Sequence, residues 1–169
     1  MASTARTTKR LRPNPTRNQI WRQLDRASFA VLSYVTPNGQ PRSSGVVYTA
    51  GQGRLYVAVA PTSWKALHIP ATGQVAITVP IRRGGLLSLL FPIPPATISF
   101  HARAVVHPVG PPGADSLSPA LARLVPAERL ADCRILEIFP EDQFVTYGIG
   151  VPLLELRDPA AARARIPVA

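Results

Sequence analysis

The stretch that decides the fold spans residues 29–60 and reads FAVLSYVTPNGQPRSSGVVYTAGQGRLYVAVA. Apolar and β-branched residues fill three short runs in it, Phe29–Val35, Arg42–Thr49 and Leu55–Ala60. The runs are separated by Pro37-Asn38-Gly39 and by Gly51-Gln52-Gly53, and both are strong turn signals. The stretch therefore predicts three antiparallel strands that follow one another as a meander.

Short helices and further strands are predicted around this meander. Thr16–Ala27 has apolar residues at helical spacing behind a threonine that can cap it, and Thr62 or Ser63 can cap a second short helix that ends at Gly73. The remaining predicted elements are strands over Gln74–Val79, Ala96–His107, Arg134–Phe139 and Phe144–Ile149 and a helix over Ser116–Leu130. Hairpin-connected strands with few helices are typical of a closed or nearly closed β-barrel of about six strands.

Length and composition favour one globular domain, since the chain has 169 residues, 46% of them hydrophobic, and no long linker. We expect a disordered basic arm over residues 1–15, a barrel domain over 16–155 and a C-terminal tail over 156–169. The single cysteine, Cys133, excludes an internal disulfide. Residues 1–20 lack the apolar core of a signal peptide. The longest apolar stretch is too short and too interrupted to span a membrane, so we expect a cytoplasmic protein.

The net charge of +10 is unevenly distributed. Residues 1–26 contribute +6 of it, and between Arg26 and Ala114 there are six cations but no Asp or Glu. Cations without competing carboxylates favour an anionic ligand, but a dimer face balanced by the acidic C-terminal third of a partner subunit explains the pattern equally well. The few aromatic residues do not alternate with Arg or Lys, which argues against a nucleic-acid surface.

The best candidate for a binding site is Pro61-Thr62-Ser63-Trp64-Lys65, where a strand runs into a capped helix. The start of a helix offers free N–H groups, and the hydroxyls of Thr62 and Ser63 and the ammonium of Lys65 would join them around a phosphate. A capped helix with a solvated lysine is the alternative. Arg42, which Ser43 and Ser44 follow, could reach the same anion.

Other chemistries find less support in the sequence. His68, His101 and His107 lack the spacing of metal ligands, so no metal site is predicted. No glycine-rich nucleotide loop is present, and no nucleophile stands beside a base.

The ordered set of Phe29–Tyr34, Thr36–Ser44, Leu55–Val57, Ser63-Trp64-Lys65 and Val75–Val79 resembles the pyridoxamine 5′-phosphate oxidase-like, flavin-binding split-barrel family. The resemblance covers residues 19–107, about half of the chain, and extends more loosely to residue 150. It implies a mainly β fold, a six-stranded antiparallel split β-barrel with short flanking helices. It also implies a homodimer with the cofactor site between the two subunits.

The resemblance implies that Arg42, Ser63 and Lys65 hold the phosphate of FMN, or of the deazaflavin coenzyme F-420 that some members use. The ring would lie against the backbone of the second and third strands, with Thr97 of the fifth strand near the cofactor. The full set of expected cofactor-binding residues is Arg42, Ser43, Ser44, Val46, Val47, Ala58, Val59, Thr62, Ser63, Trp64, Lys65 and Thr97.

Two departures from the family pattern bear on function. Trp64 stands where the true oxidases carry a phosphate-binding arginine, and no tryptophan follows it to grip the substrate, which argues against pyridoxamine phosphate. We expect a flavin- or deazaflavin-dependent oxidoreductase with another small-molecule substrate. The alternative is a non-catalytic flavin-binding or sensing protein, or a haem-binding one that uses His68 or His101. The insert Arg82–Pro95 is expected to roof the flavin, to pack in the dimer or to form an apolar entrance.

Overall fold

The computed structural model describes residues 14–83, 94–109 and 125–169. Most of the predicted arm 1–15, of the insert 82–95 and of the helix expected over 116–130 lies outside these residues. The described elements are, in chain order, α1 (Arg17–Arg26), β1 (Phe29–Val35), β2 (Pro41–Val47), β3 (Thr49–Gly51), β4 (Arg54–Val59), α2 (Trp64–Thr72), β5 (Gln74–Ile81), β6 (Ala96–Val106), α5 (Ala127–Leu130), β7 (Arg134–Pro140), β8 (Gln143–Tyr147), the 3₁₀ turn η1 (Leu153–Arg157), α6 (Pro159–Ala162) and β9 (Arg163–Pro167).

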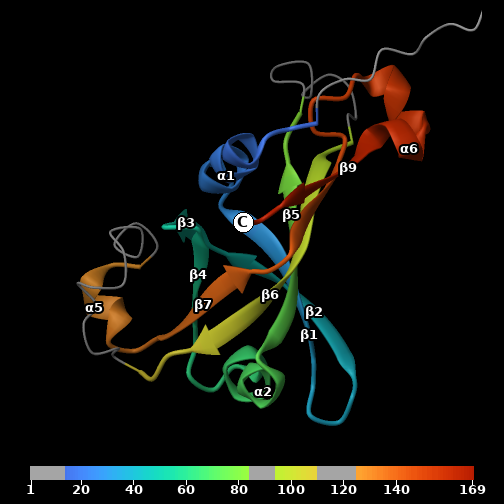
Figure 1. The fold of residues 1–169 in the computed structure, drawn as a ribbon. Coiled ribbons are helices and arrows are strands. Elements are labelled where there is room, and N and C mark those ends of the chain that lie inside the picture. Colours follow the sequence, from blue (N-terminus) through green and yellow to red (C-terminus); the bar gives the residue numbers. More distant parts are fainter. Residues whose placement is uncertain (1–13, 84–93, 110–124) are drawn as a thin grey trace, which may run out of the picture.

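The strands form one antiparallel sheet in the order β2-β1-β5-β6-β7-β4-β3, from which β8 and β9 branch at β6 (Figure 1). The first and last strands of this path, β2 and β3, are consecutive in the chain and are joined by Tyr48. The sheet therefore curls back toward its own beginning. This confirms the mainly β split-barrel fold, with nine described strands where about six were expected.

The predicted three-stranded meander is wrong in one respect. β1 and β2 pair as expected, but the second predicted strand breaks at Tyr48, and β4 pairs with β3 and β7 and not with β2. The run from Pro41 to Gly51 is long enough to serve both halves of the barrel. Its first part completes the half built on β1, and its second part completes the half built on β4.

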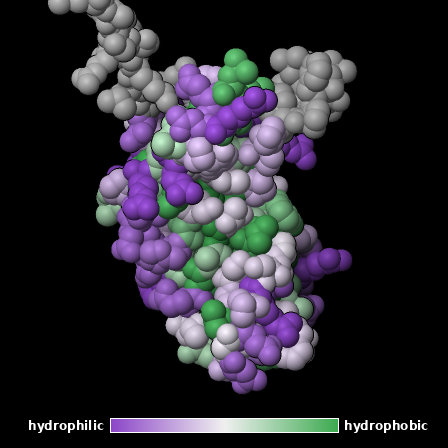
Figure 2. Space-filling model, turned by 90° about the vertical axis from the view of Figure 1, so that its right-hand side faces the viewer, coloured by the Kyte–Doolittle hydropathy of each residue, from purple (hydrophilic) through white to green (hydrophobic). Residues whose placement is uncertain are grey.

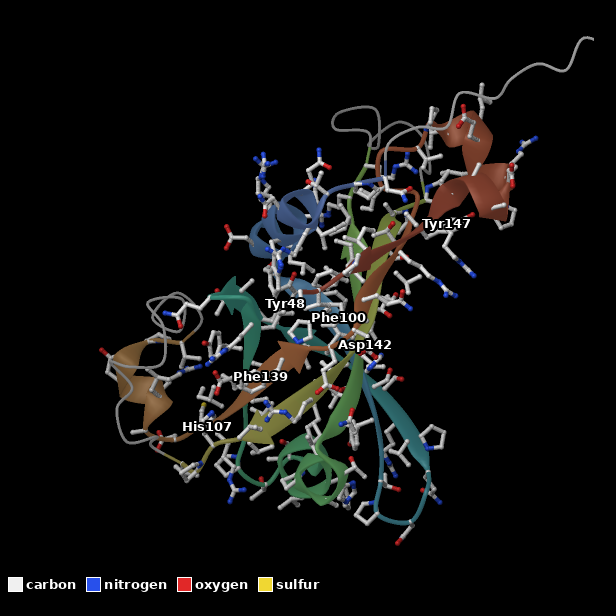
Figure 3. All side chains as sticks on the ribbon, in the orientation of Figure 1. Tyr48, Phe100, His107, Phe139, Asp142 and Tyr147 are labelled. Carbon is white, nitrogen blue, oxygen red and sulfur yellow. The ribbon has the colours of Figure 1, made fainter. Side chains whose placement is uncertain are left out.

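Helix α1 covers one end of the barrel, where Ile20 and Leu24 are fully buried. Thr16 caps the helix, as the sequence indicated, and the structure adds Gln19, with which Thr16 forms a reciprocal capping box. The indole of Trp21 meets the ring of Phe144 edge to face, with 5.6 Å between centroids. This contact fixes α1 to β8. A second contact, the hydrogen bond from Tyr48 Oη to the carbonyl of Leu24, fixes α1 to the residue after β2, and Figure 3 labels Tyr48 below the helix.

Helix α2 begins and ends as the sequence predicted. Ser63, and not Thr62, is the N-cap, and Gly73 ends the helix in the left-handed conformation with φ 65°. Ala66 and Ile69 are its buried residues.

The C-terminal residues belong to the sheet, since β9 pairs along its length with β8. The intervening turn is held from both sides, because Arg83 Nη2 donates to the carbonyl of Val151 and Tyr147 Oη donates to that of Leu156. In the described ranges no helix has the length and apolar character that crossing a membrane requires.

Candidate functional site

Strand β2 divides its side chains between the two faces of the sheet. Arg42 and Ser44 lie opposite Tyr34 and Leu32 of β1, so they share the inward face with these buried residues. Val46 follows on the same face inside the core. Ser43 and Val47 point outward, and the hydroxyl of Ser43 is 2.7 Å from that of Ser33. Of the β2 residues expected at the cofactor, Arg42, Ser44 and Val46 therefore share the inward face, and Arg42 contacts Trp64 of α2.

The N-terminus of α2 supplies hydrogen-bond donors. The hydroxyl oxygen of Ser63 accepts from the N–H of Ala66 at 3.3 Å, and its proton remains free to donate. Trp64 and Lys65 occupy the first turn, where backbone N–H groups have no partner inside the helix. Thr62 is exposed in the preceding turn.

Arg42 and the N-terminus of α2 come together in the fold. The guanidinium carbon of Arg42 lies 5.8 Å from the centre of the Trp64 ring, within the range of a cation–π contact. The Trp64 ring is 5.0 Å from that of His68, which is 6.2 Å from that of Tyr34. Tyr34 is in turn the cross-strand partner of Arg42. We call these four residues, Tyr34, Arg42, Trp64 and His68, the Arg42 cluster.

Two buried polar atoms at this end of the barrel lack partners among the described residues, namely Ser44 Oγ and His68 Nδ1. Ser44 is two residues from Arg42 on the same strand face, and His68 is one helical turn from Trp64. Buried polar groups are nearly always paired, so orphaned ones indicate a ligand or water that completes them. Orphaned polar atoms beside a cation fit a polar, anionic ligand.

Within the described ranges neither Arg42 nor Lys65 makes an ion pair. Arg54 differs, because its Nη1 lies 2.6 Å from Glu137 Oε1, and this hydrogen bond raises the pKa of the guanidinium. Glu137 thus neutralises Arg54, whereas no carboxylate of the described residues neutralises Arg42 or Lys65.

The remaining expected residues are more scattered. Thr97 lies on β6, and strands β1 and β5 separate it from β2. Within a single subunit Thr97 therefore does not reach Arg42. Val59 is buried in the main core, whereas Ala58 faces a small separate cluster around Tyr56 and Ile135. Both residues lie at the end of β4, the strand that leads into α2.

The outward face of β1 and β2 carries exposed apolar side chains at both ends of the hairpin, on either side of the Ser33–Ser43 hydroxyl pair. Phe29, Val35 and Val47 are 47%, 45% and 60% exposed. The Phe29 ring lies directly over Gly45, where an added Cβ would come within 2.8 Å of it. Figure 2, which views the molecule from the side of the β1–β2 hairpin, shows apolar atoms in a band across the middle, bordered by hydrophilic side chains. We call Phe29, Val35 and Val47 the outer patch.

A second polar cluster, which the sequence analysis did not find, lies on β4, β6 and β7. The buried carboxylate of Glu137 is 2.6 Å from Arg54 and 2.9 Å from His107 Nε2. Burial is the main cause, and Glu137 the next, of a raised pKa at Tyr56. The guanidinium groups of Arg54 and Arg103 stack on Phe139, which Figure 3 labels near His107. No group of metal-ligating side chains occurs among the described residues.

Comparison with known proteins shows the fold and leaves the family open. No protein-family model matches the sequence, and neither does any curated protein. A heme binding protein from Mycobacterium smegmatis shares the fold with a TM-score of 0.66 at 14% identity, over 93% of this chain and 60% of that one. This chain thus spans about three fifths of that protein.

Two other solved structures align over most of their own length. An F420 reductase has a TM-score of 0.52 at 19% identity, over 76% of this chain and 95% of that one. A Listeria innocua protein provisionally described as a pyridoxamine 5′-phosphate oxidase has a TM-score of 0.55 at 13% identity, over 74% and 93%. The fold that the sequence resemblance implied is therefore confirmed.

Proposed function

We propose that this chain, which has the split β-barrel fold of pyridoxamine 5′-phosphate oxidase-like proteins, binds a flavin-type cofactor by its phosphate and works as a homodimeric oxidoreductase on a small molecule. The observation that carries the proposal is the meeting of Arg42 with the N-terminus of α2. A guanidinium, the Lys65 ammonium, the Ser63 hydroxyl and two helical N–H groups are the donors that a phosphate dianion takes in proteins.

The cofactor, FMN or the deazaflavin coenzyme F-420, supplies the hydride chemistry when bound. The residues of the chain would bind and orient it. Arg42, Ser63 and Lys65 hold the phosphate, and the backbone of Ser43–Val47 and of Ala58 and Val59 carries the ring. The proteins of this fold whose names mention F420, FAD-binding or heme support a cofactor of this size.

The homodimer is proposed from the outer patch. Its three large side chains would leave water when a second copy covers them, and burying apolar area contributes about 25 cal/mol per Å². Thr97 lies on the same outward face, two strands beyond the patch. Since its own chain keeps it away from Arg42, Thr97 would join the site only across the subunit boundary.

Thermal shift with FMN and with coenzyme F-420 tests the proposal on the full chain. Ligand at 100 times its Kd should add about 2.7 kcal/mol to the free energy of unfolding. Lys65→Ala should weaken FMN binding by about 1.5–3 kcal/mol, or roughly 10- to 150-fold, because it removes a charge-assisted contact. Arg163→Ala, at an exposed arginine of β9, is the control and should leave the affinity unchanged. Equal affinities of the Lys65→Ala variant and the unaltered chain would refute the site.

Haem binding is the second candidate, because His68 Nδ1 is buried without a partner in the part of the chain that the structure describes, and a protein of this fold is named for heme. His101 is the other candidate ligand, although its Nε2 already lies 3.0 Å from Asp142. A Soret band on haem addition that is lost in His68→Ala or His101→Ala, together with no shift by FMN, would favour haem over flavin.

A further inference from the structure

Trp64 is an unusual residue for its position. Its side chain is 61% exposed, although it is one of the largest apolar groups in the chain. It occupies the first position of α2, directly after the N-cap. Because so much of the indole is exposed to water, packing in the core does not explain why a tryptophan occupies this position. Its ring contacts, with Arg42 at 5.8 Å and His68 at 5.0 Å, are the features that remain.

The contacts of Trp64 belong to a closed arrangement. Trp64 touches Arg42 and His68, His68 touches Tyr34, and Tyr34 pairs across the hairpin with Arg42. Tyr34 is buried, and His68 is half-buried, so the side chains that support Trp64 are themselves held by the barrel. Through Trp64 and His68 of α2, the Arg42 guanidinium is therefore linked to Tyr34, which lies on the same β1–β2 hairpin as Arg42.

We infer that Trp64 is a positioning residue, which holds the Arg42 guanidinium at the N-terminus of α2 for a phosphate monoester. The inference rests on the proposed function. It gives a role to Trp64, which stands where the true oxidases carry a phosphate-binding arginine. An arginine side chain loses rotamer freedom when it binds an anion, and a stacked guanidinium has lost part of that freedom beforehand. Trp64 therefore strengthens phosphate binding without touching the phosphate.

Two other roles of Trp64 make different predictions. If the indole touched the cofactor ring, its removal would weaken FMN and riboflavin alike, whatever residue stood at position 42. If it only anchored α2, its removal would lower the thermal stability and leave Arg42-dependent binding unchanged. Positioning instead requires that the effect on binding depend on both Arg42 and the phosphate.

A double-mutant cycle on the full-length chain separates these roles. Kd values for FMN and riboflavin are measured for the unaltered chain, Trp64→Leu, Arg42→Met and the double variant, with the Tm of each. Trp64→Leu should weaken FMN about two- to fivefold, the equivalent of an exposed cation–π contact, and leave riboflavin unchanged. In the Arg42→Met background it should have no further effect. Leu67→Ala, at a 53% exposed residue of the same helix, is the matched control and should alter neither affinity.

A ligand-free measurement checks the contact itself. Trp21→Phe leaves Trp64 as the one tryptophan of the chain, and its emission should change when Arg42→Met is added. Unchanged emission, additive effects in the cycle, or equal losses for FMN and riboflavin would overturn the positioning role while the proposed function stands. Failure of the unaltered chain to bind any of FMN, coenzyme F-420 and inorganic phosphate would overturn both.

Discussion

The phenol hydroxyl of Tyr48 donates a hydrogen bond of 2.7 Å to the main-chain carbonyl of Leu24, and this bond fastens α1 to the junction of β2 and β3. Tyr48 is 2% exposed. Burial, and secondarily the negative charge of Asp25, raises the pKa of the phenol above its ordinary value of 10.0. The contact therefore links helix docking to the protonation of one side chain.

Tyr48→Phe should lower the free energy of unfolding at neutral pH by about 1–2 kcal/mol, because the carbonyl of Leu24 loses its donor in a buried place. Urea denaturation measures the loss. An unchanged urea midpoint would mean that a water molecule replaces the Tyr48 hydroxyl as donor without loss of stability.

The same residue predicts an alkaline limit. The folded chain keeps the phenol proton that the unfolded chain loses near pH 10, so the contribution of Tyr48 is fully present below that pH. It is lost as the pH rises above 10 toward the raised pKa of the folded state. Stability measured between pH 9 and 11 should fall less steeply in Tyr48→Phe than in the unaltered chain. Parallel curves would contradict this assignment.

Glu137 should matter more than its single charge suggests. Its carboxylate is buried and accepts from both Arg54 and His107, so Glu137→Ala should cost about 1–3 kcal/mol of stability. Asp142→Asn alters the exposed contact with His101 Nε2 and should change stability by less than about 0.5 kcal/mol. Chemical denaturation compares the two variants. Similar losses in the free energy of unfolding would show that the burial of Glu137 does not increase its contribution to stability.

The β3–β4 hairpin should be improvable by one substitution. Gln52 and Gly53 form its two-residue loop with φ of 53° and 72°, which is a type I′ turn. Asparagine tolerates this conformation better than glutamine does, so Gln52→Asn should raise the Tm and add about 0.5 kcal/mol. A lower Tm would indicate that the glutamine side chain has a contact that outweighs the backbone strain.

The proposed dimer predicts a sharp response at the outer patch. Val47→Glu should favour the monomer, because two copies of the same face would bury the new charges without partners. We expect a loss of about 2–4 kcal/mol, seen as at least a 30-fold rise in the dimer dissociation constant. Leu154→Glu, at an 87% exposed residue of η1, is the control and should leave the assembly intact. Molar mass by light scattering reports both, and an unaltered mass for Val47→Glu would exclude this face.

The sequence predicted the elements well where local signals decide. The Thr16 cap, the Ser63 cap and Gly73 fix the helices, and the turn at Pro37–Gly39 fixes the register of β1 against β2. That register also places Tyr34 opposite Arg42, and the spacing of four residues places His68 beside Trp64. Tyr34 and His68, the two members of the Arg42 cluster that were not expected at the phosphate site, could therefore be located from the sequence.

Long-range pairing set the limit. The division of residues 41–51 between two halves of the barrel depends on β7, more than 80 residues later, and no local pattern shows it. The contact of Arg54 with Glu137 is equally remote in sequence. β9 was expected to be a tail, because its strand character comes from pairing with β8 and its own composition is rich in Arg and Ala.

Strand β6 has a consequence for how the chain is made. It pairs with β5 along one edge, and along the other with β8 and then β7, which come from residues 134–147. A ribosome synthesises β6 before β7 and β8. On the nascent chain, the edge of β6 that later pairs with them therefore has no partner strand at first. Open edges invite association with other chains, and distant pairings form slowly. The barrel can therefore close only after residues 134–147 have been synthesised, and until then β6 is the segment that a chaperone would have to protect.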